Sequence, residues 1–261
     1  MPRMADPLPV LRVSHEQLAE VVRGLDDAAL TGPSYCDDWN VAQVLSHLGS
    51  GAEIGQGLLR KARGADGLPD SQEIWARWDA MSPTEMAAGY LAANDSYLAA
   101  YEGIDEQERL SLLLPFFTGP TPVGQVLMFR LTEHALHSWD VRVLDDPQAT
   151  VLPAAVPLLL ELTAMTAQWA AKPAAVDLGG PARLAITLTE PDREFVFTVA
   201  DGQAELAVDA DAGEATGTLR IPAEAFVRLT TGRLDPDHTP AGVESTGSPT
   251  LDELRLIFPG F

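Results

Sequence analysis

The segment Met128–Arg142, MFRLTEHALHSWDVR, places several chemically capable side chains on one face of a predicted helix. Because an α-helix turns about 100° per residue, Glu133 and His137 lie one above the other. Arg130 and Asp140 stand three residues outside this pair and extend the same face in both directions. A carboxylate and an imidazole one turn apart can bind one divalent metal, as the two histidines of an H-E-x-x-H helix do. On its own, an E-x-x-x-H pattern also arises by chance.

A second segment, Trp39–Glu53 (WNVAQVLSHLGSGAE), supplies a histidine on another predicted helix. His47 lies at the edge of an apolar helical stripe made by Val41, Val44, Leu45 and Leu48. Ser50 and Gly51 follow His47 by three and four residues and are small enough to leave space for a bound ion and its ligand. The alternative for His47 is an ordinary histidine at the edge of a helical bundle.

Together, the two segments resemble the DinB-like metal-binding bundle and, more closely, the mycothiol-dependent maleylpyruvate isomerase family. That family carries a tryptophan before a helix with His-Leu, and later a helix with Arg-x-x-Glu-x-x-x-His-x-x-Asp. The matching residues in this chain are Trp39, His47, Leu48, Arg130, Glu133, His137 and Asp140. The resemblance extends into the C-terminal third, where the family's Gly-Arg-Leu and terminal Phe-Pro-Gly-Phe elements correspond to Gly232-Arg233-Leu234 and Phe258–Phe261.

The composition predicts a soluble protein that does not bind nucleic acid. At 261 residues, the chain can form two modest domains with a core each. The hydrophobic content is 46%, no apolar run is long enough to span a bilayer, and the first residues lack the apolar core of a secretory signal. A formal charge of −21 would repel a phosphate backbone. We therefore expect a cytoplasmic protein, which the single cysteine, Cys36, also favours.

Helical patterns fill the first two-thirds of the chain. Ser14–Gln17 matches a capping box that would open the first helix, and a second helix is expected over about residues 40–63. Ser82–Glu85 is a clear start for a third helix, with proline at the first helical position. Residues 104–120 are expected to form a connection, and Thr121-Pro122 begins the helix that carries Glu133 and His137.

The apolar period changes from helical to alternating after Lys172-Pro173, which we take as the domain boundary. A helix over about residues 154–171 would finish the first domain. Alternation then predicts short strands around residues 184–188, 195–199, 204–208 and 219–221. A helix over about residues 222–231 would cover one face of their sheet.

These patterns predict an α+β protein of two domains. Residues 1–172 would form a four-helix bundle, and residues 173–261 would form a small α+β domain with an antiparallel sheet. The resemblance identifies the first domain as a DinB-like metal-binding bundle and the second as a sterol-carrier-like domain.

His47, Glu133 and His137 would form a two-histidine, one-carboxylate metal site with a position left for water or a ligand. This donor set is typical of catalytic zinc, since structural zinc sites are usually closed by four protein ligands. Zinc is the first candidate, and nickel, cobalt, iron or manganese could bind the same donors. Asp140 could accept a hydrogen bond from His137, and Arg130 could brace Glu133. A simple ion pair on the helix surface is the alternative for each.

The other polar candidates are expected to lie outside the metal site. Two adjacent carboxylates should oppose thiolate formation at Cys36, so we expect a structural rather than a nucleophilic cysteine. His134 is expected on the flank of its helix. His15 and His238 are not expected to take part in the site.

The resemblance implies the chemistry. Members of the family bind mycothiol, a low-molecular-weight thiol whose sulfur takes the open metal position, and isomerise a cis double bond by reversible thiol addition. The family also uses an arginine of its C-terminal domain, for which Arg233 is the first candidate here and Arg228 the second. Either could hold a substrate carboxylate. We expect a thiol-dependent metalloenzyme that acts on a small electrophile, as a monomer or homodimer, with no nucleic-acid or membrane partner.

Two alternatives stay open. The same metal and thiol could add to an electrophile and stop there, which would make the protein a thiol S-transferase in detoxification or natural-product biosynthesis. The chain could instead be a non-catalytic small-molecule-binding protein of the same fold. The acidic balance counts against an anionic substrate, although the local charge in a pocket matters more than the net charge.

Overall fold

The computed structural model describes residues 6–260, apart from the side chain of Leu110. The chain divides into two compact units, Met1–Ala155 and Val156–Phe261. Phe261, the last residue of the terminal Phe-Pro-Gly-Phe element, lies outside the described residues.

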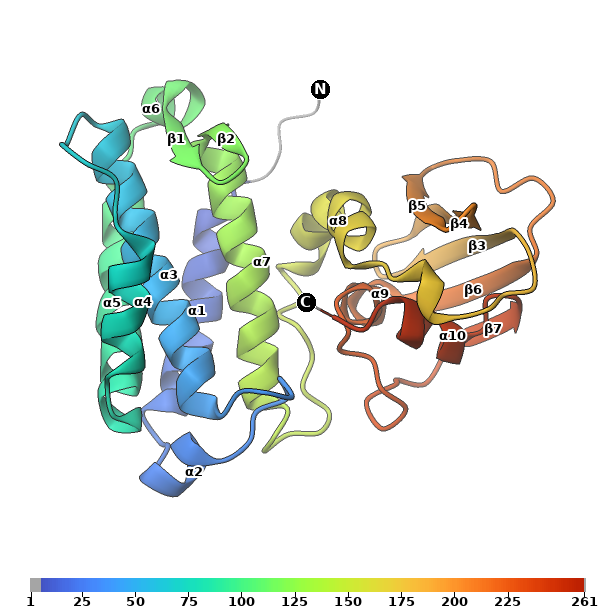
Figure 1. Cartoon of the computed structure of the whole chain (residues 1–261), viewed down its shortest axis with the longest axis horizontal. Helices are drawn as coiled ribbons and strands as arrows, with labels where there is room; N and C mark the ends of the chain where they lie inside the picture. Colours follow the sequence, from blue (N-terminus) through green and yellow to red (C-terminus); the bar gives the residue numbers. More distant parts are fainter. Residues whose placement is uncertain (1–5, 261) are drawn as a thin grey trace. The chain divides into compact units, whose positions relative to one another are not determined.

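In the described part of the first unit, long helices form the predicted bundle. They run alongside one another (Figure 1), with α3 packed on α5, and α1 packed on both α5 and α7. Packing of this kind buries an apolar stripe on each helix and leaves facing side chains in position to build a site. The long helices are α1 (Leu8–Val22), α3 (Val41–Ala62), α5 (Pro83–Glu102) and α7 (Val123–Arg142). The shorter elements are α2 (Asp27–Thr31), α4 (Ser71–Asp79), α6 (Glu106–Ser111), β1 (Leu113–Phe116) and β2 (Gly119–Pro122).

Capping boxes set the starts of two of these helices. The predicted box at Ser82 and Glu85 is present at the start of α5. A second box opens α3, where the side chain of Asn40 accepts a hydrogen bond from the backbone amide of Gln43. These local contacts satisfy backbone amides that a helix leaves without partners in its first turn.

The predicted start of the first helix is wrong. α1 begins at Leu8, after Pro7, and Ser14 lies inside the helix. The Ser14 hydroxyl is buried and forms a hydrogen bond with Nδ1 of His134, 2.9 Å away, rather than capping a helix end. The hydroxyl that the sequence pattern assigned to a helix cap therefore forms a tertiary hydrogen bond with His134 instead.

The expected connection over residues 104–120 contains α6 and a β-hairpin. β1 and β2 pair antiparallel, from Leu113 opposite Pro122 to Phe116 opposite Gly119. Gly119 has a φ of +100°, a backbone conformation that glycine adopts with little strain. The hairpin reverses the chain just before α7 begins.

Two glycines let an indole ring fill the space between α3 and α5. Trp78, on α4, is buried. A Cβ atom at Gly49 of α3 would lie 2.2 Å from its ring, and one at Gly89 of α5 would lie 2.9 Å away. Nε1 of Trp78 donates a hydrogen bond to Glu53, 3.1 Å away. The indole therefore holds α3, the helix that carries His47, against its neighbours.

A buried polar layer joins α1, α5 and α7. Nε2 of His15 lies 2.9 Å from Oδ1 of Asp95, and Nδ1 of His15 lies 3.2 Å from the hydroxyl of Tyr90. The same hydroxyl lies 3.0 Å from Nε2 of His134, whose Nδ1 bonds Ser14. Because a carboxylate only accepts, a neutral His15 carries its proton on Nε2 and accepts from Tyr90 at Nδ1. Tyr90 then accepts from His134, and His134 accepts from Ser14.

The second unit has the predicted α+β layers. Its sheet has the strand order β5-β4-β3-β6-β7. β3 and β6 are parallel, so the sheet is mixed rather than purely antiparallel; the other neighbouring pairs are antiparallel. After β5 the chain crosses to the other side of β3, and β6 begins at the same end of the sheet as β3. The strands are β3 (Ala182–Thr189), β4 (Arg193–Ala200), β5 (Gln203–Val208), β6 (Gly217–Pro222) and β7 (Glu244–Gly247).

Helices cover the buried side of this sheet. α9 packs on β3 and β6, and α8 packs on α9 and β5. Aromatic rings fill the layer between them: the centroids of Phe195 and Phe226 are 5.3 Å apart, and those of Phe197 and Phe258 are 5.2 Å apart. The helices of this unit are α8 (Val156–Ala170), the 3-10 turn η1 (Pro173–Ala175), α9 (Ala223–Thr230) and α10 (Leu251–Ile257).

The division between the units falls after Ala155, whereas the sequence predicted a boundary after Lys172. The difference is α8, which was expected to finish the bundle. Its contacts with α9 and β5 place it in the second unit instead. Among the residues that the structure describes, no helix is long and apolar enough to cross a membrane.

Gly49→Ala should destabilise the first unit, because the added methyl group would overlap the ring of Trp78. We expect the free energy of unfolding to fall by about 1–3 kcal/mol, the usual cost of overpacking. Gly124→Ala is the matched control, since a Cβ atom there meets nothing within 4 Å. Chemical denaturation should show this control to be neutral or slightly stabilised. Equal losses in the two variants would contradict the close packing at Gly49.

The stability of the first unit should fall as the pH drops below about 6.5. Burial lowers the pKa of His15 and of His134 below the ordinary value of 6.5, so protons bind preferentially to the unfolded chain in the window below that value. Melting temperatures measured between about pH 7.5 and about pH 5 should show this decline. His15→Gln should flatten it. An unchanged slope in His15→Gln would contradict this explanation.

Candidate metal centre

The structure brings the three predicted ligands together within the first unit. His47 lies on α3, and Glu133 and His137 lie on α7. Nε2 of His47 is 2.9 Å from Oε2 of Glu133, and Nε2 of His137 is 3.8 Å from the same oxygen. One possible ligand atom from each residue lies within 4.8 Å of the others. The three side chains thus converge on one point between two helices.

This spacing fits one divalent ion. Ligand atoms bound about 2.0–2.1 Å from a tetrahedral zinc ion stand about 3.3 Å from one another. The two separations to Oε2 of Glu133, 2.9 and 3.8 Å, lie on either side of that value. The side chains of His47 and Glu133 are 37% and 39% exposed, so one side of the group is open to solvent and to a further ligand.

Glu133 is charged over the whole physiological pH range. Burial raises the pKa of its carboxyl group. The hydrogen bond from His47 and the charges of His137 and Arg130 lower the pKa by more than burial raises it, to about 2. A carboxylate that is already ionised can bind a cation without first releasing a proton.

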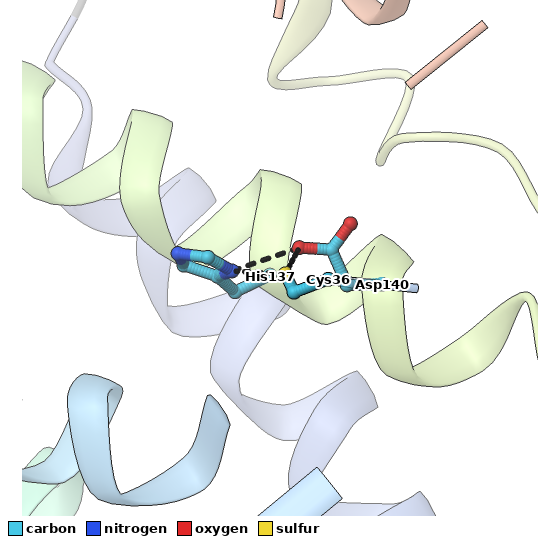
Figure 2. Close-up of side chains that lie close together, drawn as sticks. All are labelled: Cys36, His137 and Asp140. Carbon is cyan, nitrogen blue, oxygen red and sulfur yellow. Dashed lines mark hydrogen bonds and ion pairs between the residues drawn. The ribbon is translucent and has the colours of Figure 1, made fainter. Parts of the chain in front are cut away.

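Asp140 orients the second imidazole. Its Oδ2 lies 2.8 Å from Nδ1 of His137, on the same helix (Figure 2). Because a carboxylate accepts the bond, Nδ1 carries the proton and the lone pair of Nε2 is left on the side of Glu133. The Asp140 side chain is fully buried and that of His137 is 11% exposed. The hydrogen bond is therefore an interior one and not an ion pair on the helix surface.

Trp39 lies beside both imidazole rings. Its ring centroid is 5.1 Å from that of His47 and 5.9 Å from that of His137. The indole gives the candidate centre an apolar side next to its polar donors. Such a boundary lowers the local dielectric and strengthens the interaction of the donors with a cation.

Arg130 is buried and contacts other groups than the sequence suggests. Its Nη2 donates to the carbonyl of Leu48 at 2.7 Å and to Oδ1 of Asn94 at 2.5 Å. Its guanidinium carbon lies 5.5 Å from the ring centroid of Tyr97. Arg130 thus braces α3 and α5, and it acts on Glu133 through its charge.

Of the two small residues after His47, Gly51 makes room for the side chain of Arg130. A Cβ atom at Gly51 would lie 3.0 Å from Nη1 of Arg130. The Ser50 hydroxyl donates to the carbonyl of His47 at 3.1 Å, within the same helix. The expectation that Ser50 and Gly51 leave space for an ion and its ligand stays a prediction.

Two histidines that were not predicted to bind the metal are core residues. His134 is fully buried and His15 is 2% exposed, both in the polar layer of the bundle. The prediction of a flank position for His134 is wrong. Helical periodicity could have indicated this, because His134 shares its face with the buried Leu131 and Ser138.

The two candidate arginines lie in the second unit, and both are largely buried. Nε and Nη2 of Arg228 donate to the two carboxylate oxygens of Glu224, at 2.8 and 3.0 Å. Nη1 of Arg233 donates to the carbonyl of Thr231 at 2.8 Å. The bidentate ion pair gives Arg228 a structural role within its own unit.

Cys36 lies next to the three predicted ligands and is not one of them. Its Sγ is 3.1 Å from Oδ2 of Asp140 and 3.8 Å from Nδ1 of His137. These three residues form a second group with the spacing of metal ligands. In this second group, Nδ1 of His137 is engaged in the hydrogen bond to Asp140. The other ring nitrogen of His137, Nε2, faces Glu133 and belongs to the first group.

Comparisons with known proteins agree with both units. The family described as mycothiol maleylpyruvate isomerase N-terminal domain matches residues 11–142, and the SCP-2 sterol transfer family matches residues 160–240. The crystal structure of the mycothiol-dependent maleylpyruvate isomerase has a TM-score of 0.64 at 17% identity. That of a histidine-to-alanine mutant of the isomerase has a TM-score of 0.63 at 16% identity. Each comparison covers 94% of this chain and 93% of the other. No curated protein matches significantly in sequence.

Replacing His47, Glu133 or His137 by alanine should each lower the affinity for zinc more than 100-fold. Loss of a partner that only supports a ligand typically costs about 10–100-fold, and loss of a ligand should cost more. Chelator competition measures the affinity, and elemental analysis of protein purified without a nickel column measures the bound metal. His238→Ala, a histidine of the second unit, is the control and should bind zinc normally. Undiminished zinc in all three ligand variants would refute the site.

Proposed function

Because the chain belongs to the mycothiol-dependent maleylpyruvate isomerase family, we propose that it is a thiol-dependent metalloenzyme that acts on a small electrophile. The observation that supports this proposal is that His47, Glu133 and His137 converge, and that His47 and Glu133 are partly exposed to solvent. Zinc is the first candidate for the metal. When bound, the ion would act as a Lewis acid that lowers the pKa of a coordinated thiol, so that the thiolate forms at neutral pH.

The residues of the chain would bind and orient the reactants. Glu133 contributes one negative charge to the donor set, so a divalent ion there would keep a net positive charge, which would attract an anionic sulfur. Asp140 holds the proton on Nδ1 of His137 and keeps Nε2 directed at the centre. Trp39 covers both imidazoles on its side of the site, which leaves the exposed side for thiol and substrate.

The nucleophile would come from outside the chain. Cys36 is the single cysteine, and its thiol donates a hydrogen bond to Asp140. A neighbouring carboxylate opposes ionisation of a thiol, so this sulfur is poorly suited to attack a substrate. Mycothiol, the thiol of the matching family, is the external nucleophile that we propose.

Arg233 is the residue of the second unit that we propose for contact with a substrate carboxylate. The proposal rests on the family resemblance at Gly232-Arg233-Leu234. A planar guanidinium can hold a carboxylate through two parallel hydrogen bonds.

We propose cis–trans isomerisation as the first reaction to test, with S-transfer as the second. In the isomerase, the sulfur adds to one carbon of an activated double bond, rotation follows, and elimination returns the thiol. In a transferase the carbon–sulfur bond would persist. The solved isomerase structures are 17% and 16% identical to this chain, and a fold shared at that distance is compatible with either reaction.

Turnover should require both metal and added thiol. We expect purified zinc-loaded protein to convert maleylpyruvate only when mycothiol is present, and Glu133→Gln to lose this activity. Glu108→Gln is the control, because it removes an exposed carboxylate whose ion pair is with Arg63 and not with a predicted ligand. The rate should persist below the pKa of about 8.5 typical of a free thiol.

Product analysis separates the possible reactions. Thiol recovered unchanged with a trans product identifies an isomerase. Thiol consumed one-for-one, tested also with monobromobimane as a general electrophile, identifies an S-transferase. Activity without any thiol, or binding of substrate without turnover under all these conditions, would overturn the proposed enzyme.

A further inference from the structure

A short loop before α3 carries two residues to the candidate metal centre. Ser34 organises this loop: its amide and hydroxyl both donate to the carbonyl of Trp39, at 3.1 and 2.7 Å, and its hydroxyl accepts from the amide of Cys36 at 3.0 Å. The amide of Trp39 donates to the carbonyl of Cys36 at 2.9 Å. These bonds place the thiol of Cys36 and the indole of Trp39 with little freedom.

The loop is also tied to α7 itself. The amide of Tyr35 donates to the carbonyl of Asp140 at 3.2 Å, and the ring of Tyr35 lies 4.6 Å from that of Trp139, edge to face. A backbone bond and a ring contact therefore hold Cys36 against the last turns of α7. The position of the thiol follows from this docking and not from local helix geometry.

The thiol meets the carboxylate that orients His137. Figure 2 shows Sγ of Cys36 and Nδ1 of His137 directed at the same oxygen, Oδ2 of Asp140. The distances are 3.1 Å from Sγ and 2.8 Å from Nδ1. An S–H group is a donor and a carboxylate oxygen can accept two hydrogen bonds. The fully buried Asp140 thus gains a partner that partly offsets its loss of hydration.

We propose that Cys36 is a positioning residue for the metal ligand His137. The hydrogen bond from its S–H group holds Oδ2 of Asp140 in place. Asp140 in turn keeps the proton on Nδ1 of His137 and orients the ring so that Nε2 faces Glu133. The inference rests on the proposed metal centre. It assigns the single cysteine a supporting role in metal binding, in place of nucleophilic attack or direct coordination.

Direct coordination by Cys36 does not fit the same geometry. The thiol lies on the Nδ1 side of His137, and the ion of the proposed centre would lie on the Nε2 side. An ion held by Cys36, Asp140 and Nδ1 would have to displace the proton that joins His137 to Asp140. A hydrogen-bonded thiol satisfies the buried carboxylate without that loss.

The test is a double-mutant cycle on zinc affinity, measured by chelator competition. Cys36→Ala should weaken zinc binding by about three- to tenfold, less than the about 10–100-fold expected for Asp140→Ala, because the thiol acts through the carboxylate. Cys36→Ser, which keeps a donor, should restore most of the affinity. In the Asp140→Ala background, Cys36→Ala should have no further effect, because the path through the carboxylate is already absent.

The d–d spectrum of the cobalt-substituted protein supplies a second readout. Cys36→Ala should perturb the spectrum, while Cys36→Ser should leave it close to that of the parent. Loss of a sulfur-to-cobalt charge-transfer band on Cys36→Ser would show a coordinated thiol and overturn the proposal. Cys36→Val, which fills the space without a donor, replaces Cys36→Ala if the latter does not fold.

The outcomes also separate this inference from the proposed function. Equal zinc affinity in the parent and Cys36→Ala, or an equal loss in the presence and absence of Asp140, would overturn the positioning role alone. Failure of thiol-dependent turnover in a protein that binds zinc would overturn the proposed reaction and leave the positioning role standing. A parent protein that binds no zinc would overturn both.

Discussion

The rotation of α7 about its own axis controls both the candidate metal centre and the polar core of the bundle. Glu133 and His134 are adjacent, so their side chains point about 100° apart. One faces His47 of α3, and the other is buried with Tyr90 and Ser14. Leaving a buried polar group without its partner costs about 1–3 kcal/mol. The polar layer therefore opposes any turn of α7 that would move Glu133 away from α3.

The centre combines a partly exposed carboxyl group, that of Glu133, and a fully buried one, that of Asp140, with hydrogen-bond donors. Glu133 bonds His47, and Asp140 accepts from His137 and Cys36. The charge of the buried Arg130 guanidinium also lowers the pKa of Glu133. In a chain with a net charge of −21, this local positive charge would favour the approach of the thiolate that we propose.

Local patterns predicted much of this protein. Capping chemistry at Ser82, the one-turn spacing of Glu133 and His137, and the alternation of apolar residues after residue 182 all depend on near neighbours in the chain. Such features follow from backbone geometry, because helix and strand periods determine which residues share a face. They also gave the α+β class and the family resemblance that the comparisons confirm.

The sequence by itself determined the long helices, most strands of the second unit and the candidate metal ligands. Only the tertiary structure decided which of these side chains meet. His47 and Glu133 are 86 positions apart and Cys36 and Asp140 are 104 apart. The burial of His134, the partners of Arg130, the true start of α1 and the place of α8 depend equally on contacts with distant elements. Periodicity describes one element at a time, whereas the energy of a buried polar group depends on what packs against it.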